Sequence, residues 1–370
     1  MHRRTLVALM VLATLIALGA CALYRQSSHD DQAPTHEVTI FPGANVTPTA
    51  PSPTDLRIVR PILPTVSATP QDSSAIALAG PAPAASGDDV PIALRTTHNL
   101  LVLGSDQRKA GQAWRTDVIM IVALDYAHNR MGVVSVPRDL YVKIPGVGFE
   151  RINTADYYGS LRKDKDGKPR ESVELLKETL RQNLGIPIHD YVRVDFTVFK
   201  SAVDALGGVT VTVDCPLRDP HWDSPGQRYY LKPGQYFMNG EDALRYVRAR
   251  YTGTDLDRAR RQQRILLAMR DRALEVNLWP RLPTLYREFR DKVVTDLGPL
   301  EIIELARFGL RLRPEDIHGF VIGRGMVRDM ITSGGAMVLA PDYRKIRQAL
   351  DGLFDTPPLS QTNDRTGNCP

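Results

Sequence analysis

The chain has 370 residues and 43% of them are hydrophobic, so it is long enough for one large domain, or two small ones, with a buried core. Its formal net charge of +5 favours an anionic partner without choosing between nucleic acid, a membrane surface and a phosphorylated substrate. The three cysteines, Cys21, Cys215 and Cys369, show no C-x-x-C spacing, which argues against a structural zinc site.

Residues 1–25 predict a membrane anchor or export segment. A basic flank at residues 2–4 precedes an uncharged run over residues 5–24, which is long enough to span a bilayer. Because the basic flank stays in the cytoplasm, we expect the rest of the chain outside the cell membrane. We favour an uncleaved single span; the alternatives are a lipoprotein, since Leu18-Gly-Ala-Cys21 resembles a lipidation box, and full secretion. Export would permit a disulfide between Cys215 and Cys369, but the sequence does not show that they meet.

Residues 26–95 predict a disordered linker. They are rich in Pro, Ser, Thr and Ala and show no sustained helical or strand period, as in Thr47-Pro-Thr-Ala-Pro-Ser-Pro-Thr54. Such a composition cannot bury enough apolar area to offset the entropy lost on ordering. We therefore expect a semi-extended spacer that holds a folded domain of residues 96–355 away from the membrane.

Residues 96–355 alternate between apolar strand-like runs and amphipathic helical stretches, which predicts an α/β domain. The expected strands cover residues 99–104, 118–124, 131–136, 191–195, 209–213 and 316–322. The expected helices cover residues 171–184, 197–206, 258–275, 280–289, 299–310 and 341–354, with another beginning at residue 239. The strand–helix–strand order around residues 197–206 favours right-handed crossovers in one sheet, and the unbroken apolar runs indicate cover on both faces. Residues 356–370 are polar and are expected to form a loose tail.

A predicted β-hairpin brings charged side chains together. The apolar runs on either side of residues 126–129 read as its two strands. If Asp125 pairs with Arg130, the antiparallel register brings Asp117 opposite Arg138. The hairpin therefore predicts a carboxylate and a guanidinium at its open end.

Asp106 and Asp117 are the candidate metal ligands. Asp106 follows the strand over residues 99–104, which leads to the open end of the hairpin, and Arg115 lies two residues before Asp117. Two carboxylates beside several cations suit a divalent ion, since Mg²⁺ needs few protein oxygens when substrate phosphates supply the others. The alternative is an ordinary Arg–Asp bridge across the hairpin, without any ligand.

Residues 245–264 contain seven arginines and two carboxylates, Asp255 and Asp257. Planar guanidinium forks match phosphate oxygens two at a time, and a helix N-terminus adds outward-facing N–H groups, so the stretch suits a phosphate or pyrophosphate. If the helix begins near Asp255, its 3.6-residue period predicts one face that is first cationic and then apolar, made of Arg258, Arg261, Gln262, Ile265 and Met269. Arg248 and Arg250 would point the same way if their segment is extended. The alternative is a solvated basic helix.

The order and spacing of these motifs resemble the LytR–CpsA–Psr family of cell-wall glycopolymer ligases, over roughly residues 97–355. The matching motifs are Gly104-Ser-Asp106, Arg115-Thr-Asp117, Ser135-Val-Pro-Arg-Asp139, Arg151-Ile-Asn153, Val203-Asp-Ala-Leu-Gly-Gly-Val209, Asn239-Gly-Glu-Asp-Ala-Leu244, Tyr246-Val-Arg-Ala-Arg250 and Asp255-Leu-Asp-Arg-Ala-Arg-Arg-Gln-Gln263. Two positions depart from the family pattern: Arg151 stands where lysine is usual, and Asp257 where glycine is common.

The resemblance implies a three-layer α/β/α sandwich with a central mixed sheet, helices on both faces and an apolar tunnel for a polyprenyl chain. It implies a phosphotransferase that moves a phosphoglycosyl polymer from undecaprenyl pyrophosphate to peptidoglycan, with Mg²⁺ or Mn²⁺ at the pyrophosphate. Asp106 and Asp117 would bind the metal. The catalytic residues that act on the phosphates would be Arg115, Arg138, Arg248, Arg250 and Arg258, with Asp255 orienting them or activating the acceptor hydroxyl. Further substrate-binding residues would be Arg151, Arg261, Gln262, Ile265 and Met269.

Two other functions stay open at this point. A lipid pyrophosphate phosphatase would send the same phosphoryl group to water, and a non-catalytic membrane-anchored regulator, or transcriptional attenuator, would bind without turnover. The export segment and the lack of a helix-turn-helix pattern argue against nucleic acid as a partner. Phosphoryl transfer depends on positioning and positive charge and needs no protein nucleophile, so Ser105 and Ser135 are predicted to be structural.

Overall fold

A six-stranded mixed sheet lies at the centre of the computed structural model, which describes residues 90–105, 114–163, 172–223, 228–276, 293–309, 311–364 and 369. The strand order is β11-β6-β1-β2-β3-β12, formed by Val294–Thr295, Asp190–Asp195, His98–Ser105, Thr116–Asp125, Arg130–Ser135 and Ile317–Val321. β1, β2 and β3 are antiparallel neighbours, whereas β6 runs parallel to β1 and β12 runs parallel to β3. The predicted α/β class with a central mixed sheet is therefore confirmed.

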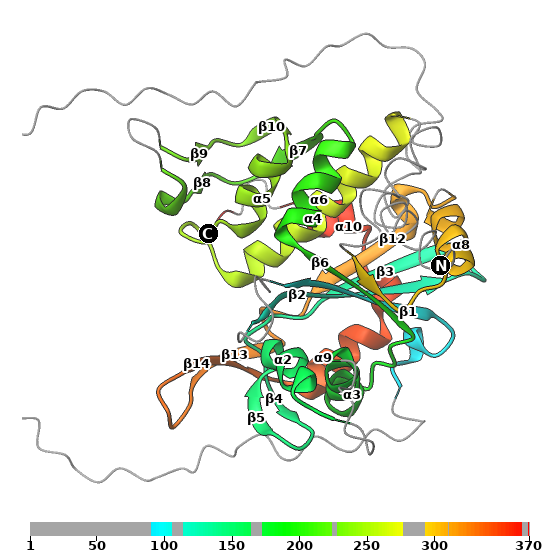
Figure 1. The fold of residues 1–370 in the computed structure, drawn as a ribbon, viewed down its shortest axis with the longest axis vertical. Helices are drawn as coiled ribbons and strands as arrows, with labels where there is room; N and C mark the ends of the chain where they lie inside the picture. The colour runs from blue at the N-terminus through cyan, green and yellow to red at the C-terminus, as the bar shows by residue number, and fades with distance from the viewer. Residues whose placement is uncertain are drawn as a thin grey trace, which may run out of the picture.

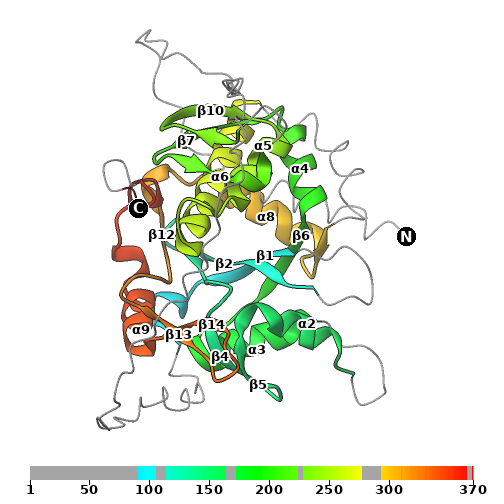
Figure 2. The ribbon, with the colours of Figure 1, turned by 90° about the vertical axis from the view of Figure 1, so that its left-hand side faces the viewer.

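Helices cover both faces of this sheet and give the molecule three layers (Figures 1 and 2). One face carries α4 (Phe196–Ala205), α5 (Gly240–Arg248), α6 (Asp255–Glu275) and α8 (Pro299–Gly309), and the other carries α2 (Ala155–Ser160), α3 (Val173–Leu184) and α9 (Tyr343–Asp351). In β1, Leu100 and Val102 pack into the core beneath α8, while Leu101 and Leu103 pack into the core shared with α3 and α9. A strand buried on both faces has no polar alternation, and this explains the unbroken apolar runs of the sequence.

The β2–β3 hairpin has the predicted register, with Asp125 opposite Arg130. Arg130 Nε donates to Asp125 Oδ2 at 2.8 Å, and His128 Nδ1 lies 2.8 Å from the same oxygen. Asp125 is only 1% exposed, and burial raises its pKa, but the hydrogen bonds from Arg130 and His128 outweigh burial and lower it. A slip of one residue would break this buried pair and turn every strand side chain to the wrong face.

The predicted crossover from residues 191–195 to residues 209–213 within one sheet is wrong. β7 (Val209–Val213) pairs instead with β10 (Gly234–Met238) in a separate two-stranded sheet beside α4, α5 and α6 (Figure 1). Its valines are buried while Thr210 and Thr212 are exposed, so β7 alternates in a way that the central strands do not. Alternation marks a strand with one solvated face, and that signal argued for a peripheral position.

Three further small sheets were not predicted. They pair β4 (Tyr141–Ile144) with β5 (Gly148–Arg151), β8 (Leu217–Arg218) with β9 (Tyr230–Leu231), and β13 (Val327–Ile331) with β14 (Met337–Pro341). The predicted helices match better: α3 ends at Leu184 and is capped by Gly185, whose φ of 70° is the left-handed conformation that glycine tolerates. The helix predicted over residues 280–289 lies outside the described residues.

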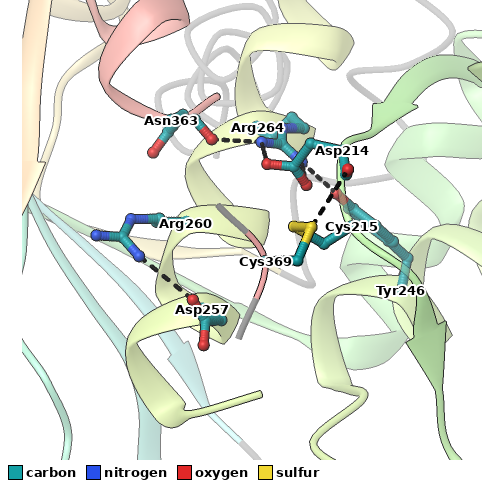
Figure 3. The surroundings of a disulfide bond; sticks show 8 residues. All are labelled: Asp214, Cys215, Tyr246, Asp257, Arg260, Arg264, Asn363 and Cys369. Carbon is teal, nitrogen blue, oxygen red and sulfur yellow. Dashed lines mark hydrogen bonds and ion pairs between the residues drawn. A yellow bond between two sulfur atoms is a disulfide. The ribbon is translucent and has the colours of Figure 1, made fainter. Parts of the chain in front are cut away.

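The C-terminal segment, expected to be loose, is anchored to the domain in its described part. α10 (Leu359–Thr362) buries Leu359 beneath the central sheet, and Cys369 forms a disulfide with Cys215. Beside the disulfide, Arg264 forms a two-pronged pair with Asp214 at 2.6 and 2.7 Å (Figure 3). The bond joins positions 154 residues apart, so the sequence offered no local sign of it.

The N-terminal predictions concern residues outside the described part of the chain. The described part begins at Val90, and a 3-10 turn at Ile92–Leu94 already buries Leu94, so packing starts a few residues before the predicted boundary at residue 96. Among the described residues, no helix combines the length and the hydropathy needed to cross a bilayer. The anchor of residues 1–25 and the linker up to residue 89 stay predictions.

Candidate functional site

Arg138 is the centre of a charge cluster at the open end of the β2–β3 hairpin. It follows β3, and its Nη1 donates to Asp117 Oδ1 of β2 at 2.8 Å, which is the approach that the hairpin register predicts. Its Nε lies 3.2 Å from Asp139 Oδ2, and its Nη2 lies 3.6 Å from Asp255 Oδ2 at the start of α6. One guanidinium therefore holds three carboxylates from three different segments.

The first turn of α6 delivers the next two members of the cluster. Thr254 caps the helix: its hydroxyl accepts from the Asp257 N–H, and the Asp257 carboxylate accepts from the Thr254 N–H at 2.8 Å. Asp257 thus completes a capping box. The cap directs Asp255 and Arg258 towards β2, where Arg258 Nη2 donates to the Asp117 carbonyl at 2.8 Å.

Arg250 and Arg151 close the cluster from two other sides. Arg250 Nη2 lies 4.0 Å from Asp117 Oδ2, and Arg250 Nε lies 3.7 Å from Asp255 Oδ1. Arg151, at the end of β5, has its Nε 3.3 Å from Asp139 Oδ1. The seven side chains comprise four guanidinium groups and three carboxylates, and this excess of positive charge suits an anion with several oxygens.

Burial and mutual proximity shift the pKa values inside this cluster. Burial, with Arg250 nearby, lowers the pKa of Arg258 to about 10, which leaves it charged at neutral pH. Burial raises the pKa of Asp139 despite the attraction of Arg138. Burial also acts to raise the pKa of Asp255, but Arg258 and Arg138 outweigh it, so the pKa is lowered and the carboxylate stays ionised.

An apolar cavity of about 110 Å³ opens directly behind the cluster. Its polar end is lined by Asp117, Arg248, Arg258 and Gln262. The rest of its lining comes from β1, β2, β6, α4, α5 and α6 and is largely apolar, including Val198, Phe199, Ala202, Leu244, Ile265 and Met269. The cavity therefore joins a cationic mouth to a hydrophobic interior, and among the described residues it does not extend into the predicted long tunnel.

The predicted face of α6 is partly correct. Arg258, Gln262, Ile265 and Met269 line the cavity, whereas Arg261 turns away from it and donates to main-chain carbonyls at the C-terminal end of α5. At about 100° per residue, Gln262, Ile265 and Met269 lie within about 40° of Arg258 around the helix axis, whereas Arg261 is displaced from Arg258 by about 60°. Because of this offset, the Arg261 guanidinium meets the end of α5 and does not join the charge cluster.

Of the other residues predicted to act on the phosphates or the metal, the structure describes Arg248 and Arg115. Arg248 ends α5 instead of lying in an extended segment; its guanidinium stacks 4.4 Å from the Phe196 ring at the cavity lining, apart from Arg250. Arg115 is exposed just before β2. Asp106 lies outside the described residues. Asp139 was not assigned a role from the sequence, although it stands directly after Arg138 in a motif that was noted.

No group of three metal-ligating side chains occurs in the described part of the chain. Asp117 is the described member of the predicted Asp106–Asp117 pair. Its Oδ1 accepts from Arg138, while its Oδ2 stands 4.0 Å from Arg250 Nη2, outside hydrogen-bond range. A carboxylate oxygen of this kind is a ligand type that Mg²⁺ and Mn²⁺ accept, so the residue fits a divalent ion.

Comparison with known proteins gives concordant matches. The LytR_cpsA_psr family model matches residues 74–351. Regulatory protein MsrR of Staphylococcus aureus is 30% identical over 262 residues, which is 70% of this chain and 74% of MsrR. The polyisoprenyl-teichoic acid–peptidoglycan teichoic acid transferase TagT of Bacillus subtilis is 32% identical over 192 residues, which is 50% of this chain and 56% of TagT.

Solved structures agree with these sequence matches. Bacillus subtilis TagV aligns with a TM-score of 0.55 and 28% identity, covering 71% of this chain and 99% of TagV. TagT bound to LI-WTA aligns with a TM-score of 0.55 and 25% identity, covering 71% of this chain and 92% of that one. TagT has also been solved with a bound octaprenyl pyrophosphate lipid; at 24% identity and a TM-score of 0.52, that likeness supports the shared fold.

Proposed function

Because this chain belongs to the LytR_cpsA_psr family, we propose that it is a phosphotransferase that moves a phosphoglycosyl polymer from undecaprenyl pyrophosphate to peptidoglycan. Relatives carry the corresponding name: TagT is a polyisoprenyl-teichoic acid–peptidoglycan teichoic acid transferase. The proposal extends to the place of action, with the N-terminal span in the cell membrane and the catalytic domain outside it.

The observation that carries the proposal is that two residues belong to both the charge cluster and the cavity. Asp117 and Arg258 line the polar end of the apolar cavity, and the same two side chains face Arg138, Arg250 and Asp255. A ligand with a diphosphate head and a hydrocarbon tail satisfies both environments at once. A free phosphate would leave the apolar lining unfilled.

The arginines would act by neutralising the charge that spreads over the non-bridging oxygens during phosphoryl transfer. Arg138, Arg250 and Arg258 already stand around a common point, held by Asp117 and Asp255, so little reorganisation is needed when the diphosphate binds. Arg151 would assist from the Asp139 side of the cluster. Gln262, Ile265 and Met269 would contact the lipid as it enters the cavity.

In the proposed step, the acceptor hydroxyl oxygen of peptidoglycan forms a bond to the phosphorus next to the sugar. The bond between that phosphorus and the bridging oxygen of the diphosphate breaks, and polyprenyl phosphate leaves. The hydroxyl proton passes to the carboxylate of Asp255, which Arg138 and Arg258 keep ionised. A divalent ion held by Asp117 and, as predicted from the sequence, Asp106 would supply further positive charge at the diphosphate.

The test is product analysis with the full-length protein, polyprenyl pyrophosphate-linked glycopolymer and Mg²⁺, with and without peptidoglycan. Transfer predicts polymer bound to peptidoglycan and release of polyprenyl phosphate, both lost in Arg138→Ala. Free phosphorylated polymer whether or not peptidoglycan is present would instead establish a lipid pyrophosphate phosphatase. Binding without any product would establish a non-catalytic regulator. A reporter fused at Pro370 that gave a cytoplasmic signal would contradict the proposed location.

A further inference from the structure

Arg261 is a buried cation that binds main-chain carbonyls. It is 8% exposed, its Nε donates to the carbonyl of Tyr246 at 3.0 Å, and its Nη2 donates to the carbonyl of Ala249. Both carbonyls belong to the end of α5, where a helix has no internal donors left for its last C=O groups. A side chain of α6 therefore caps the C-terminus of α5.

The helix end is held from the other side by Asp219. The N–H of Arg250 would continue α5 by donating to Tyr246, but it donates instead to Asp219 Oδ2 at 2.8 Å. Asp219 is 2% exposed and also accepts from the N–H of His221 at 3.0 Å. Arg261 thus donates to the Tyr246 carbonyl, which the N–H of Arg250 would bind in a continued helix, and the Asp219 carboxylate accepts from that N–H instead.

These two contacts fix the backbone at the point where the charge cluster begins. Arg248 ends α5 and lines the cavity, and Arg250, two residues later, reaches Asp117 and Asp255. The chain must turn sharply between them, because a continued helix would carry Arg250 to a different side of α5. Burying a guanidinium among carbonyls costs desolvation, and burial indeed lowers the pKa of Arg261, so a contact of this kind calls for a specific role.

We propose that Arg261 and Asp219 are positioning residues that clamp the turn after α5 and thereby aim Arg250 at the diphosphate. This proposal rests on the function proposed above, but it concerns the orientation of Arg250 and not the fate of the phosphoryl group. It gives Arg261 a different role from the direct substrate contact that the sequence predicted. Neither residue is expected to touch the ligand.

The test is a double-mutant cycle read out as the affinity for farnesyl pyrophosphate, so that it does not depend on transfer. Arg261→Lys keeps the charge but loses the fork, and it should weaken binding about tenfold in the wild-type background. In the Arg250→Ala background the same substitution should change affinity by less than about twofold, because the group it positions is gone. Asp219→Ala should behave in the same way, and Asp219→Asn, which keeps one acceptor oxygen, should recover part of the loss.

Arg264→Lys is the matched control. Arg264 lies one turn along the same helix and is also held in a two-pronged contact, with Asp214, but this contact supports the disulfide segment. Arg264→Lys should lower the melting temperature and leave the affinity within about twofold of wild type. Equal losses from Arg261→Lys in both backgrounds, or an equal loss from Arg264→Lys, would overturn the positioning role. If Arg261→Lys does not fold, the Asp219 variants are measured in the wild-type and Arg250→Ala backgrounds in its place. A wild-type protein that binds no farnesyl pyrophosphate would overturn this proposal and the proposed function together.

Discussion

Removing the Cys215–Cys369 disulfide should cost several kcal/mol of stability. The bond closes a loop of 154 residues, and the chain-entropy relation for a loop of this length gives about 5 kcal/mol at 25 °C. Residual order in the reduced, unfolded chain makes this an upper value, so we expect about 3–5 kcal/mol for Cys215→Ser/Cys369→Ser. With a urea dependence of about 3 kcal/mol/M, the unfolding midpoint should fall by about 1 M or more.

The assay is urea unfolding followed by circular dichroism, with and without dithiothreitol. Reduction should shift wild type to the midpoint of the double variant and leave the variant unchanged. Because Leu359 of α10 is buried and Arg264 contacts the carbonyl of Asn363, some of the C-terminal packing should survive the loss of the bond. A double variant with the midpoint of oxidised wild type would refute the entropic argument, since the bond would then restrain nothing in the unfolded chain.

Three other predictions concern the charge cluster and the hairpin. Asp117→Ala should abolish metal-dependent turnover while circular dichroism shows an intact fold, since Arg138 keeps Asp139 and Asp255 as partners; full activity would remove Asp117 from the metal site. Arg258→Ala should weaken lipid pyrophosphate binding about 10- to 100-fold in titration calorimetry, whereas Arg260→Ala on another face of α6 should not; equal affinities would exclude Arg258 from the site. Asp125→Asn should lower the free energy of unfolding at pH 7 by about 1.5–3 kcal/mol. Because the folded pKa of Asp125 lies below its ordinary 3.8, that deficit should shrink as the pH falls towards 3, and the same deficit at both pH values in urea unfolding would contradict the assignment.

The part of the site that the sequence could predict depends on short-range geometry. Asp125 and Arg130 bracket a four-residue turn, so a single pairing fixed where Asp117 and Arg138 would meet. The start of α6 was also predictable, because Thr254 is a residue type that caps helices and the 3.6-residue pattern of α6 begins at the next residue, Asp255. Such contacts follow from local register and need no knowledge of the tertiary fold.

The remainder of the site depends on how separate elements pack. Asp139 is adjacent to Arg138 in sequence, but adjacency alone does not show that the pair belongs to a larger cluster. That depends on how α6 packs, because α6 brings Asp255 to the same guanidinium. Arg261 has the residue type and approximate spacing of a phosphate ligand, yet the neighbouring α5 end captures its guanidinium. The position of β7 in a peripheral sheet could have been inferred from its exposed threonines, whereas the pairing of Cys215 with Cys369 could not.

Helix α6 has a consequence for which length changes the protein can accept. The helix separates two environments: Arg258, Gln262, Ile265 and Met269 face the apolar cavity, while Arg261 binds the C-terminal end of α5 and Arg264 binds Asp214 beside the disulfide. Inserting or deleting one residue near its start would rotate everything downstream by about 100°, which would move aliphatic groups into an ionic environment and guanidiniums into a hydrophobic one. Homologues should therefore keep the length of this segment, from the capping threonine to Met269, constant.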